Sequence, residues 1–276
     1  MTRLPTHADV VAAAERLKGR AVRTPLLSSP VLDAATGARV FLKPECLQRT
    51  GSFKFRGAFN ALSLIPESDR PKGVVACSSG NHAQGVAEAA RLFGIDATIL
   101  MPADAPALKI ARTRRSRATV VTYDRASEDR EALTRKLAAD KGADLVHPFD
   151  DARVIAGQGT IGLEIVEDLK ALGLSPDLVL TPASGGGLAA GIALGLEAEA
   201  PRAQVVMVEP AGFEDQARSL AAGERVSNPK TSGSICDALL SPTPGVLTFA
   251  VAQARGSAAV AASDAEALKA MAFAAT

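Results

Sequence analysis

Lys54 lies in a setting that suits a nucleophilic amine. Two phenylalanines flank it in the segment SFKFRGA (residues 52–58), and Arg56 follows two positions later. Apolar neighbours and a nearby cation both lower the pKa of a lysine, which makes its amine available for attack on a carbonyl carbon. An exposed lysine on an ordinary amphipathic helix has the same local pattern, and for this segment alone that interpretation is the more frequent one.

A second polar segment, SSGNHAQ (residues 78–84), separates a predicted strand from a predicted helix. Its short hydroxyl residues and Gly80 would present backbone N–H groups to an anion at the start of the helix, and Asn81 and His82 would add side-chain donors. A helix cap with a structural histidine explains the segment equally well.

Residues 184–188 (SGGGL) form a third such turn between a predicted strand and a predicted helix. Consecutive glycines let several backbone N–H groups converge on one phosphate, because no Cβ stands in the way. The segment matches neither GxGxxG nor a Walker loop, and a tight turn without a ligand is an equal alternative.

A fourth segment, EPAGFED (residues 209–215), places three carboxylates within seven residues. Hard cations take such oxygens, with backbone carbonyls completing the shell, although a solvated acidic loop is the favoured interpretation for this segment alone. Together, the activatable lysine, the phosphate cradle and the anion site would serve a phosphate-bearing aldehyde cofactor held as a Schiff base. Only the acidic segment would be left over.

The segments that must position these motifs alternate between strand and helix. Strands are predicted at residues 39–43, 74–76, 97–101, 118–122, 145–146, 178–180 and 204–208. Helices are predicted at residues 7–19, 51–65, 83–93, 105–117, 126–141, 159–172, 188–198 and 263–273. This alternation is typical of parallel sheets covered by helices on both faces, so the expected fold class is α/β with two αβα domains of mostly parallel sheet.

The composition excludes several classes of protein. The chain has 276 residues with 31 basic and 30 acidic side chains, and its net charge of +1 argues against a general polyanion-binding surface. It has no tryptophan and one tyrosine, too few for stacking on nucleic acid. Cys46, Cys77 and Cys236 form no CxxC pair or zinc motif and fit a reducing compartment. With no signal-peptide pattern and no apolar run of about 18 residues, we expect a cytoplasmic protein without nucleic-acid or membrane partners.

The motifs occur in the order seen in one known family. SFKFRGA, SSGNHAQ, VIAGQGT (residues 154–160) and SGGGL together resemble the fold type II pyridoxal-phosphate (PLP) enzymes of the threonine/serine dehydratase and serine racemase family, over residues 24–239. The resemblance implies a tryptophan synthase β-like fold. It also implies a large PLP-binding domain from residues 1–48 and 148–276, and a small mobile domain from residues 49–147.

The resemblance also assigns roles to residues of these motifs. Lys54 would form the Schiff base with PLP, Phe53 would pack on the cofactor ring, and Asn81 would hydrogen-bond its 3-hydroxyl group. The phosphate would be held by the backbone N–H groups of Ser184, Gly185, Gly186, Gly187 and Leu188. The substrate carboxylate would be bound by Ser78, Ser79, Asn81 and His82, with an assisting arginine at Arg130. A divalent cation, Mg²⁺ or Ca²⁺, would be bound by Glu209, the Phe213 carbonyl and Asp215.

The implied activity is that of an ammonia-lyase (dehydratase) acting on L-threonine or L-serine. Lys54 would take the α-proton, the β-hydroxyl would leave, and hydrolysis of the resulting enamine would give a 2-oxo acid and ammonia. Ser79, which could act as a second acid–base group, complicates this assignment, because plain dehydratases often have alanine there. A serine or aspartate racemase and a 3-hydroxyaspartate dehydratase are therefore alternatives. We expect a homo-oligomer, a dimer or a tetramer, with a small amino acid as substrate.

Three departures from the family pattern are visible. Ser184 replaces a glycine, Phe149 replaces an asparagine found in some racemases, and the chain ends inside the predicted helix 263–273. Relatives usually continue there with a residue that faces the pyridine nitrogen, so the short C-terminus raises the alternative of a non-catalytic binding protein with this fold. A β-replacement enzyme of the cysteine synthase type is less favoured, because the SFKxRGA form is typical of dehydratases.

Overall fold

The computed structural model describes residues 3–78, 80–124 and 127–274. Contacts between residues divide the chain into two compact units. One, here called the lysine unit, comprises Ala12–Pro148 and Glu167–Gly173. The other, here called the glycine-loop unit, comprises the chain up to Val11, Phe149–Val166 and the chain from Leu174 onward. The expected domains at residues 49–147 and in the remainder of the chain stay a prediction.

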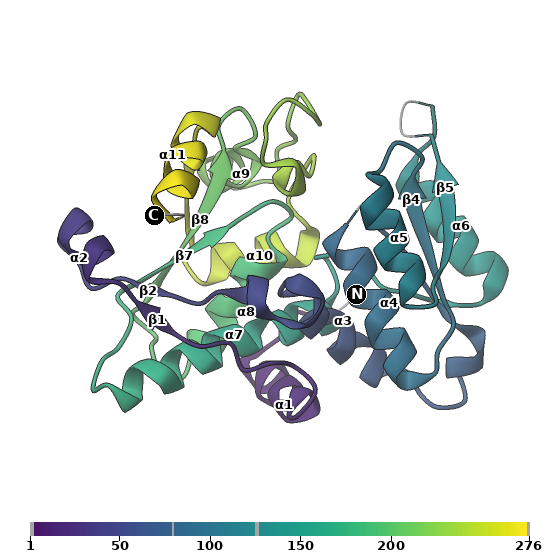
Figure 1. Cartoon of the computed structure of the whole chain (residues 1–276), viewed down its shortest axis with the longest axis horizontal. Coiled ribbons are helices and arrows are strands. Elements are labelled where there is room, and N and C mark those ends of the chain that lie inside the picture. Colours follow the sequence, from purple (N-terminus) through teal and green to yellow (C-terminus); the bar gives the residue numbers. More distant parts are fainter. Residues whose placement is uncertain (1–2, 79, 125–126, 275–276) are drawn as a thin grey trace. The chain divides into compact units, whose positions relative to one another are not determined.

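A four-stranded parallel sheet in the order β5-β4-β3-β6 forms the centre of the lysine unit. Figure 1 labels two of its strands, β4 and β5. Its strands are β3 (Val74–Cys77), β4 (Ala97–Pro102), β5 (Thr119–Tyr123) and β6 (Asp144–Leu145). Its helices are α3 (Lys54–Ser63), α4 (Asn81–Phe93), α5 (Ala107–Arg115) and α6 (Arg130–Lys141). The residues of β3 and β4 are mostly buried and apolar, which explains their central place in a sheet that is covered on both faces.

The first part of the lysine unit is less regular. Two short strands, β1 (Leu27–Ser28) and β2 (Phe41–Leu42), pair antiparallel on either side of α2 (Pro30–Thr36). Two 3-10 turns, Glu45–Leu47 and Arg49–Gly51, then lead into α3. The chain therefore reaches the start of α3 through tight turns, and contacts with neighbouring segments must fix its position.

A three-stranded parallel sheet in the order β7-β8-β9 forms the centre of the glycine-loop unit. Its strands are β7 (Leu178–Pro182), β8 (Gln204–Pro210) and β9 (Ala258–Ala262). Its helices are α8 (Gly187–Leu196), α9 (Asp215–Ala222), α10 (Val246–Ala254) and α11 (Asp264–Ala274), with a 3-10 turn at Asp237–Leu239. Helices α1 (His7–Leu17) and α7 (Ala152–Ala171) contribute residues to both units.

Helices α7 and α8 approach each other so closely that the contact requires glycine. A Cβ on Gly195 would lie 2.3 Å from the carbonyl oxygen of Gly159, and one on Gly191 would lie 2.5 Å from that of Ile155. Gly159 packs against the Gly191 carbonyl oxygen of α8 from inside α7, which starts at Ala152, earlier than the predicted start at residue 159. This packing fixes α8 and thereby the turn that precedes it.

The structure confirms the expected α/β class with mostly parallel sheets. The sequence did not predict the short strand β1, the helices α2, α9 and α10, or the strand β9. In the part of the chain that the structure describes, no helix combines the length and the apolar character needed to cross a bilayer.

Candidate active site

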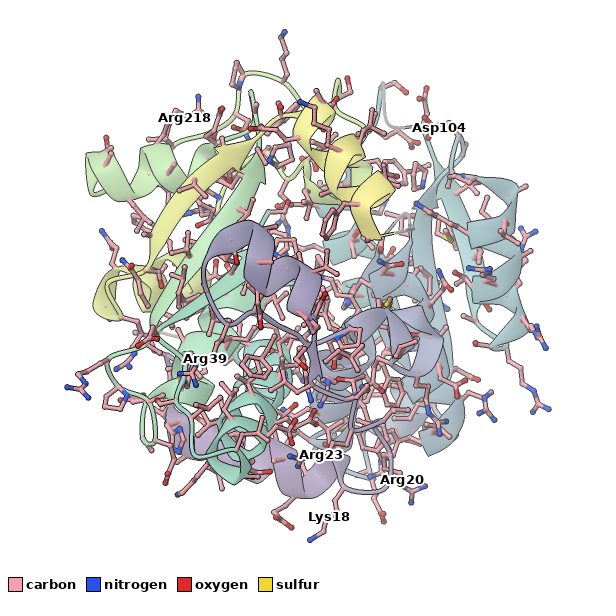
Figure 2. The ribbon with its side chains drawn as sticks, turned by 60° about the vertical axis from the view of Figure 1, so that its left-hand side comes forward. Lys18, Arg20, Arg23, Arg39, Asp104 and Arg218 are labelled. Atoms are coloured by element: carbon pink, nitrogen blue, oxygen red, sulfur yellow. The ribbon has the colours of Figure 1, made fainter. Side chains whose placement is uncertain are left out.

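Lys54 is the first residue of α3, and its side chain is half-buried. Its Nζ donates a hydrogen bond to the Pro148 carbonyl oxygen at 2.7 Å and lies 5.2 Å from the centre of the Phe53 ring. Burial disfavours the charged form and lowers the pKa of the Lys54 amine to about 8. Charged side chains such as Lys18 and Arg20, in contrast, project outward from the ribbon (Figure 2). Near neutral pH, a useful fraction of the Lys54 amine is therefore neutral and can act as a nucleophile.

A buried ion pair fixes the start of α3. Arg56 is 1% exposed, and its guanidinium donates to the two carboxylate oxygens of Glu45 at 2.8 Å each. Thr24 Oγ1 donates a further hydrogen bond to Glu45 at 2.7 Å. Arg56 was expected to lower the pKa of Lys54 through its charge, but that charge is paired with Glu45 and burial accounts for the shift. The role of Arg56 is to hold the backbone from which Lys54 projects.

Gly85 lets α4 pack directly on the backbone of α3. A Cβ on Gly85 would lie 3.0 Å from the carbonyl carbon of Lys54 and 3.2 Å from the backbone nitrogen of Phe55. These distances are shorter than ordinary contacts, so a side chain at this position would push the two helices apart. This close packing places the start of α4 near Lys54, so that the charge of the lysine helps to lower the pKa of His82.

The start of α4 offers backbone N–H groups to an anion. The Gly80 N–H group donates to Ser78 Oγ at 3.1 Å, and Asn81 is exposed at the first position of α4. No acidic side chain lies in the first turn of α4, and no side chain caps it. The first N–H groups of this helix therefore favour an anion. Ser79, which was expected to take part in catalysis and in substrate binding, lies outside the described residues.

His82 is buried and neutral. Burial and the charge of Lys54 lower the pKa of its imidazole to about 3. Its Nε2 lies 3.0 Å from the Val146 carbonyl oxygen, so Nε2 carries the hydrogen and donates it. Nδ1 is then an acceptor, and it has no partner among the described residues. A carboxylate bound at this position would therefore be held by the His82 backbone N–H group, because the ring offers it no donor.

Two cations from the following helices lie near this segment. Lys109, in the first turn of α5, has its Nζ 3.6 Å from the place that a Cβ on Gly80 would take. Burial raises the pKa of the Cys77 thiol, and the charge of Arg130, the exposed first residue of α6, opposes that rise. Arg130 therefore lies near the end of β3. The sequence did not indicate Lys109, because the lysine is far from any of the motifs along the chain.

The turn at residues 184–188 presents a row of backbone N–H groups. Within the described ranges, none of these five N–H groups donates to a protein acceptor. Two backbone carbonyl groups of the turn accept hydrogen bonds from side chains. Gln216 Nε2 donates to the Ser184 carbonyl oxygen at 2.5 Å, and Thr248 Oγ1 donates to the Gly185 carbonyl oxygen at 2.6 Å. The N–H groups are thereby left for a ligand with several acceptor oxygens. Gln216 and Thr248 belong to none of the motifs, so neither residue could be predicted from the sequence.

Phe149 explains why two of these residues are glycines. A Cβ on Gly185 would lie 2.3 Å from the ring of Phe149, and one on Gly187 would lie 3.0 Å from its backbone. Only glycine fits in this space. The phenylalanine that replaces the asparagine of some racemases is therefore part of the packing of the turn.

Comparison with known proteins shows which family the chain belongs to. Residues 18–276 match the family model of the pyridoxal-phosphate dependent enzymes. The chain belongs to this family. It is 47% identical to an L-threo-3-hydroxyaspartate ammonia-lyase from Pseudomonas sp, over 98% of this chain and 83% of that protein.

Solved structures of similar enzymes agree. A threonine deaminase from T.th. has a TM-score of 0.89 and 41% identity, over 96% of this chain and 84% of that one. Maize serine racemase has a TM-score of 0.92 and 35% identity, over 98% of this chain and 80% of that one. The resemblance to the dehydratase and racemase family, and with it the tryptophan synthase β-like fold, is confirmed.

The residues present fit PLP. In the lysine unit, the half-buried Lys54 has an amine with the lowered pKa that attack on an aldehyde requires. In the glycine-loop unit, residues 184–188 offer backbone donors to a phosphate where side chains would block its approach. Lys54 would hold the aldehyde carbon of the cofactor, and residues 184–188 would hold its phosphate.

The acidic segment forms a buried pair of carboxylates. Glu209 and Asp215 are 1% and 0% exposed, and burial raises their pKa values to about 7 and about 6. Glu209 accepts the N–H groups of the first turn of α9, while Asp215 Oδ1 accepts from Asn228 at 2.7 Å. Asp215 Oδ2 and the Phe213 carbonyl oxygen accept no hydrogen bond among the described residues.

These unpartnered oxygens fit the predicted cation. The described residues contain no cluster of three or more His, Cys, Asp or Glu side chains that could hold a metal, so the site would rely on two carboxylates and one carbonyl. Mg²⁺ and Ca²⁺ accept such a mixed oxygen shell. The cation site stays a prediction.

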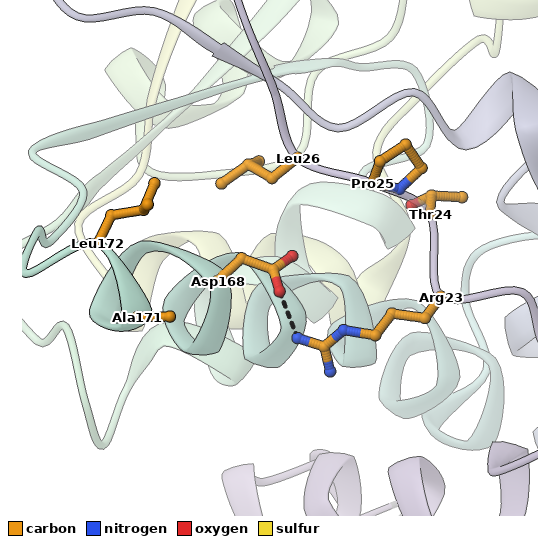
Figure 3. A pocket seen from close by; sticks show the side chains of 7 residues that line it. All are labelled: Arg23, Thr24, Pro25, Leu26, Asp168, Ala171 and Leu172. Carbon is orange, nitrogen blue, oxygen red and sulfur yellow. Dashed lines mark hydrogen bonds and ion pairs between the residues drawn. The ribbon is translucent and has the colours of Figure 1, made fainter.

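A separate cavity of about 340 Å³ lies in the lysine unit, between residues 23–26 and the end of α7 (Figure 3). Arg23 donates to Asp168 across its edge at 2.5 Å, and this bond raises the pKa of the arginine. None of the motif residues lines this cavity.

The pH dependence of PLP attachment tests the assigned state of Lys54. Only the neutral amine attacks the aldehyde, and at pH 7 about one tenth of an amine with a pKa of about 8 is neutral. The rate at which enzyme stripped of PLP regains its absorption band should therefore rise with pH up to about 8 and then level off. Free lysine serves as the reference, and a rate for the enzyme that keeps rising to pH 10 would contradict the assignment.

Gln216→Ala tests the support of the glycine turn. The Ser184 carbonyl would lose its donor and rotate toward another one, which would turn the adjoining N–H group away from the phosphate. We expect PLP to bind about tenfold more weakly, corresponding to about 1.4 kcal/mol. Gln253→Ala is the matched control, because Gln253 makes the same kind of bond to the Gly223 carbonyl at an exposed position. Equal PLP affinities for wild type and Gln216→Ala would refute this role.

Asp215→Asn tests the cation site. The amide oxygen can still accept from Asn228, while the amide nitrogen replaces the unpartnered Oδ2 and repels a cation. At a concentration 100-fold above Kd, Mg²⁺ or Ca²⁺ should stabilise the wild type by about 2.7 kcal/mol, which corresponds to a rise in Tm of about 5 to 10 °C. The variant should show no rise, and Glu214→Gln should behave as the wild type. If neither cation raises the Tm of the wild type, the predicted cation site is wrong.

Proposed function

We propose that this enzyme is an ammonia-lyase that converts a 3-hydroxy amino acid to a 2-oxo acid and ammonia. The observation that carries the proposal is the Lys54 amine, which is held by the Pro148 carbonyl oxygen and has a pKa of about 8. A base that removes a proton near neutral pH must be uncharged in a useful fraction of molecules, and this amine meets that condition. The similarity to L-threo-3-hydroxyaspartate ammonia-lyase and to threonine deaminase supports the same chemistry.

Lys54 has two tasks in this proposal. When bound, PLP withdraws electrons from the bonds at the α-carbon of an attached amino acid. Lys54 would hold the aldehyde carbon of PLP between turnovers and, as a free amine, would take the α-proton at Nζ. The β-hydroxyl group would take up a proton and leave as water, and hydrolysis of the resulting enamine would give the 2-oxo acid and ammonia. The Pro148 carbonyl oxygen accepts a hydrogen bond from Nζ at 2.7 Å and so keeps the amine oriented for this transfer.

The start of α4 holds the substrate carboxylate. Its first N–H groups, those of Asn81 and His82, favour an anion, and Ser78 adds a hydroxyl group. His82 acts through its backbone, because its neutral ring donates to Val146. The contributions of Ser79 and Arg130 stay predictions from the family resemblance.

The candidate substrates are L-threonine, L-serine and L-threo-3-hydroxyaspartate, which share an α-proton and a β-hydroxyl group. The similarity to the Pseudomonas enzyme supports the dicarboxylic substrate. Racemisation is the second candidate activity, and the similarity to maize serine racemase supports it. It requires an acid–base group on the face of the substrate opposite Lys54, a role for which the sequence nominates Ser79.

The expected homo-oligomer and the cytoplasmic location also stay predictions. Both come from the sequence and its family resemblance.

Product assays with purified, PLP-loaded enzyme test the proposed function. Ammonia and 2-oxo acid should form from at least one of the three candidate substrates. Lys54→Ala should lose at least about a hundredfold in rate, because it lacks the proton-transferring amine. Lys18→Ala is the control, since Lys18 is an exposed lysine. Wild-type enzyme that binds PLP but forms no 2-oxo acid would refute the proposal, as would an unchanged rate in Lys54→Ala.

A further inference from the structure

Asp150 holds the start of α10 from a distant part of the chain. Its Oδ1 accepts the Leu247 N–H group at 2.7 Å, and its Oδ2 accepts the Val246 N–H group at 2.9 Å. Helix α10 has no acidic residue in its own first turn, so Asp150 supplies the negative charge that a helix N-terminus favours. A Cβ on Gly245, which directly precedes α10, would lie 2.5 Å from Asp150 Oδ1. The close approach of the carboxylate therefore requires glycine at this position.

The start of α10 in turn holds the Gly185 carbonyl group. Thr248, in the first turn of α10, is 1% exposed, and its Oγ1 donates to the Gly185 oxygen at 2.6 Å. The Gly245 N–H group donates to the same oxygen at 3.2 Å. Because a trans peptide group is planar, its C=O and N–H bonds point in opposite directions, so fixing the Gly185 oxygen also fixes the Gly186 N–H group. The direction of one proposed phosphate donor therefore depends on where α10 begins.

Apolar packing holds α10 but does not set that direction. Helices α8 and α10 contact each other within the glycine-loop unit (Figure 1). Leu247 and Val251 of α10 belong to a cluster with Val10, Ile155, Ala190 and Leu194. The hydrophobic effect is non-directional, so these contacts keep the helix against the core without aiming the Thr248 hydroxyl group. Hydrogen bonds to a carboxylate are directional and strong, and those to Asp150 fix the end of the helix beside the turn at residues 184–188.

We propose that Asp150 is a positioning residue for the PLP phosphate. Its carboxylate fixes the start of α10, which places the Thr248 hydroxyl group on the Gly185 oxygen and so directs the Gly186 N–H group at the phosphate. Asp150 acts through α10, because a carboxylate has no donor to offer a phosphate. The inference rests on the assignment of the phosphate to residues 184–188. It goes beyond the proposed ammonia-lyase function, since it concerns the binding of the cofactor whatever the reaction.

Titrations of PLP and of pyridoxal into enzyme stripped of PLP test the proposal. Pyridoxal has the same aldehyde and lacks the phosphate, so it reports any general damage to the fold or to Lys54. In Asp150→Ala, we expect Kd for PLP to rise about tenfold and Kd for pyridoxal to change less than about twofold. Asp150→Asn keeps one acceptor oxygen for the start of α10, so it should show the same selective loss at about threefold.

Asp129→Ala is the matched control. Asp129 accepts two N–H groups at the start of α6, at 2.8 and 3.2 Å, as Asp150 does at the start of α10. Helix α6 lies in the lysine unit and does not hold the turn at residues 184–188. Both Kd values should therefore stay within about twofold of the wild type.

Thr248→Val tests the route from Asp150 to the turn. Valine keeps the shape of threonine and removes the hydroxyl donor, so this variant should also bind PLP about tenfold more weakly. Combined with Asp150→Ala, it should weaken PLP binding less than about twofold further, because both changes interrupt the same series of contacts. A double variant that binds PLP about a hundredfold more weakly than the wild type would show independent effects and would overturn the proposal.

The pyridoxal titrations separate the remaining outcomes. Equal losses for PLP and pyridoxal in Asp150→Ala would overturn the proposal, because Asp150 would then serve the fold as a whole. An unchanged Kd for PLP in that variant would overturn it as well. Wild-type enzyme that binds pyridoxal as tightly as PLP would overturn both the phosphate assignment and this proposal, while the ammonia-lyase function, which the product assays test, would stand.

Discussion

A buried charge two residues from the reactive amine determines where that amine lies. The guanidinium of Arg56 is almost fully removed from water, which is costly unless a carboxylate accepts its hydrogen bonds. Glu45 does so with both oxygens, and the start of α3 therefore cannot shift relative to the turns before it. Gly85 then lets α4 close over the backbone of Lys54. The desolvation that lowers the Lys54 pKa follows from this packing, so position and reactivity have one cause.

The glycine-loop unit offers a site in which an anion would be bound by backbone N–H groups without a buried cation. The Ser184 and Gly185 carbonyl groups accept hydrogen bonds from Gln216 and Thr248, so the N–H groups of the turn remain for an anion, which we propose is the PLP phosphate. Phe149 packs against the turn, and the glycine contacts between α7 and α8 fix the helix that follows it. A backbone site of this kind avoids the desolvation cost of a buried lysine or arginine.

The sequence predicted what depends on local pattern and missed what depends on distant contacts. Strands such as β3 and β4 followed from short apolar runs, and the motifs around Lys54 and residues 184–188 are contiguous. The start of α7 was misplaced, because glycine indicates a break unless a partner helix packs on it. Gln216 and Lys109 come from separate elements and meet their partners only in the folded chain. The protonation state of His82 depends on burial, which its motif does not encode.

We expect PLP to be bound covalently through the low-pKa amine of Lys54. The most direct measurement is peptide mass spectrometry of the PLP-loaded enzyme after reduction with borohydride, which converts the bound cofactor into a stable pyridoxyl group. We expect a single modified peptide, with the pyridoxyl group on Lys54. Modification of another lysine, such as Lys43 or Lys109, with Lys54 unmodified, would contradict it.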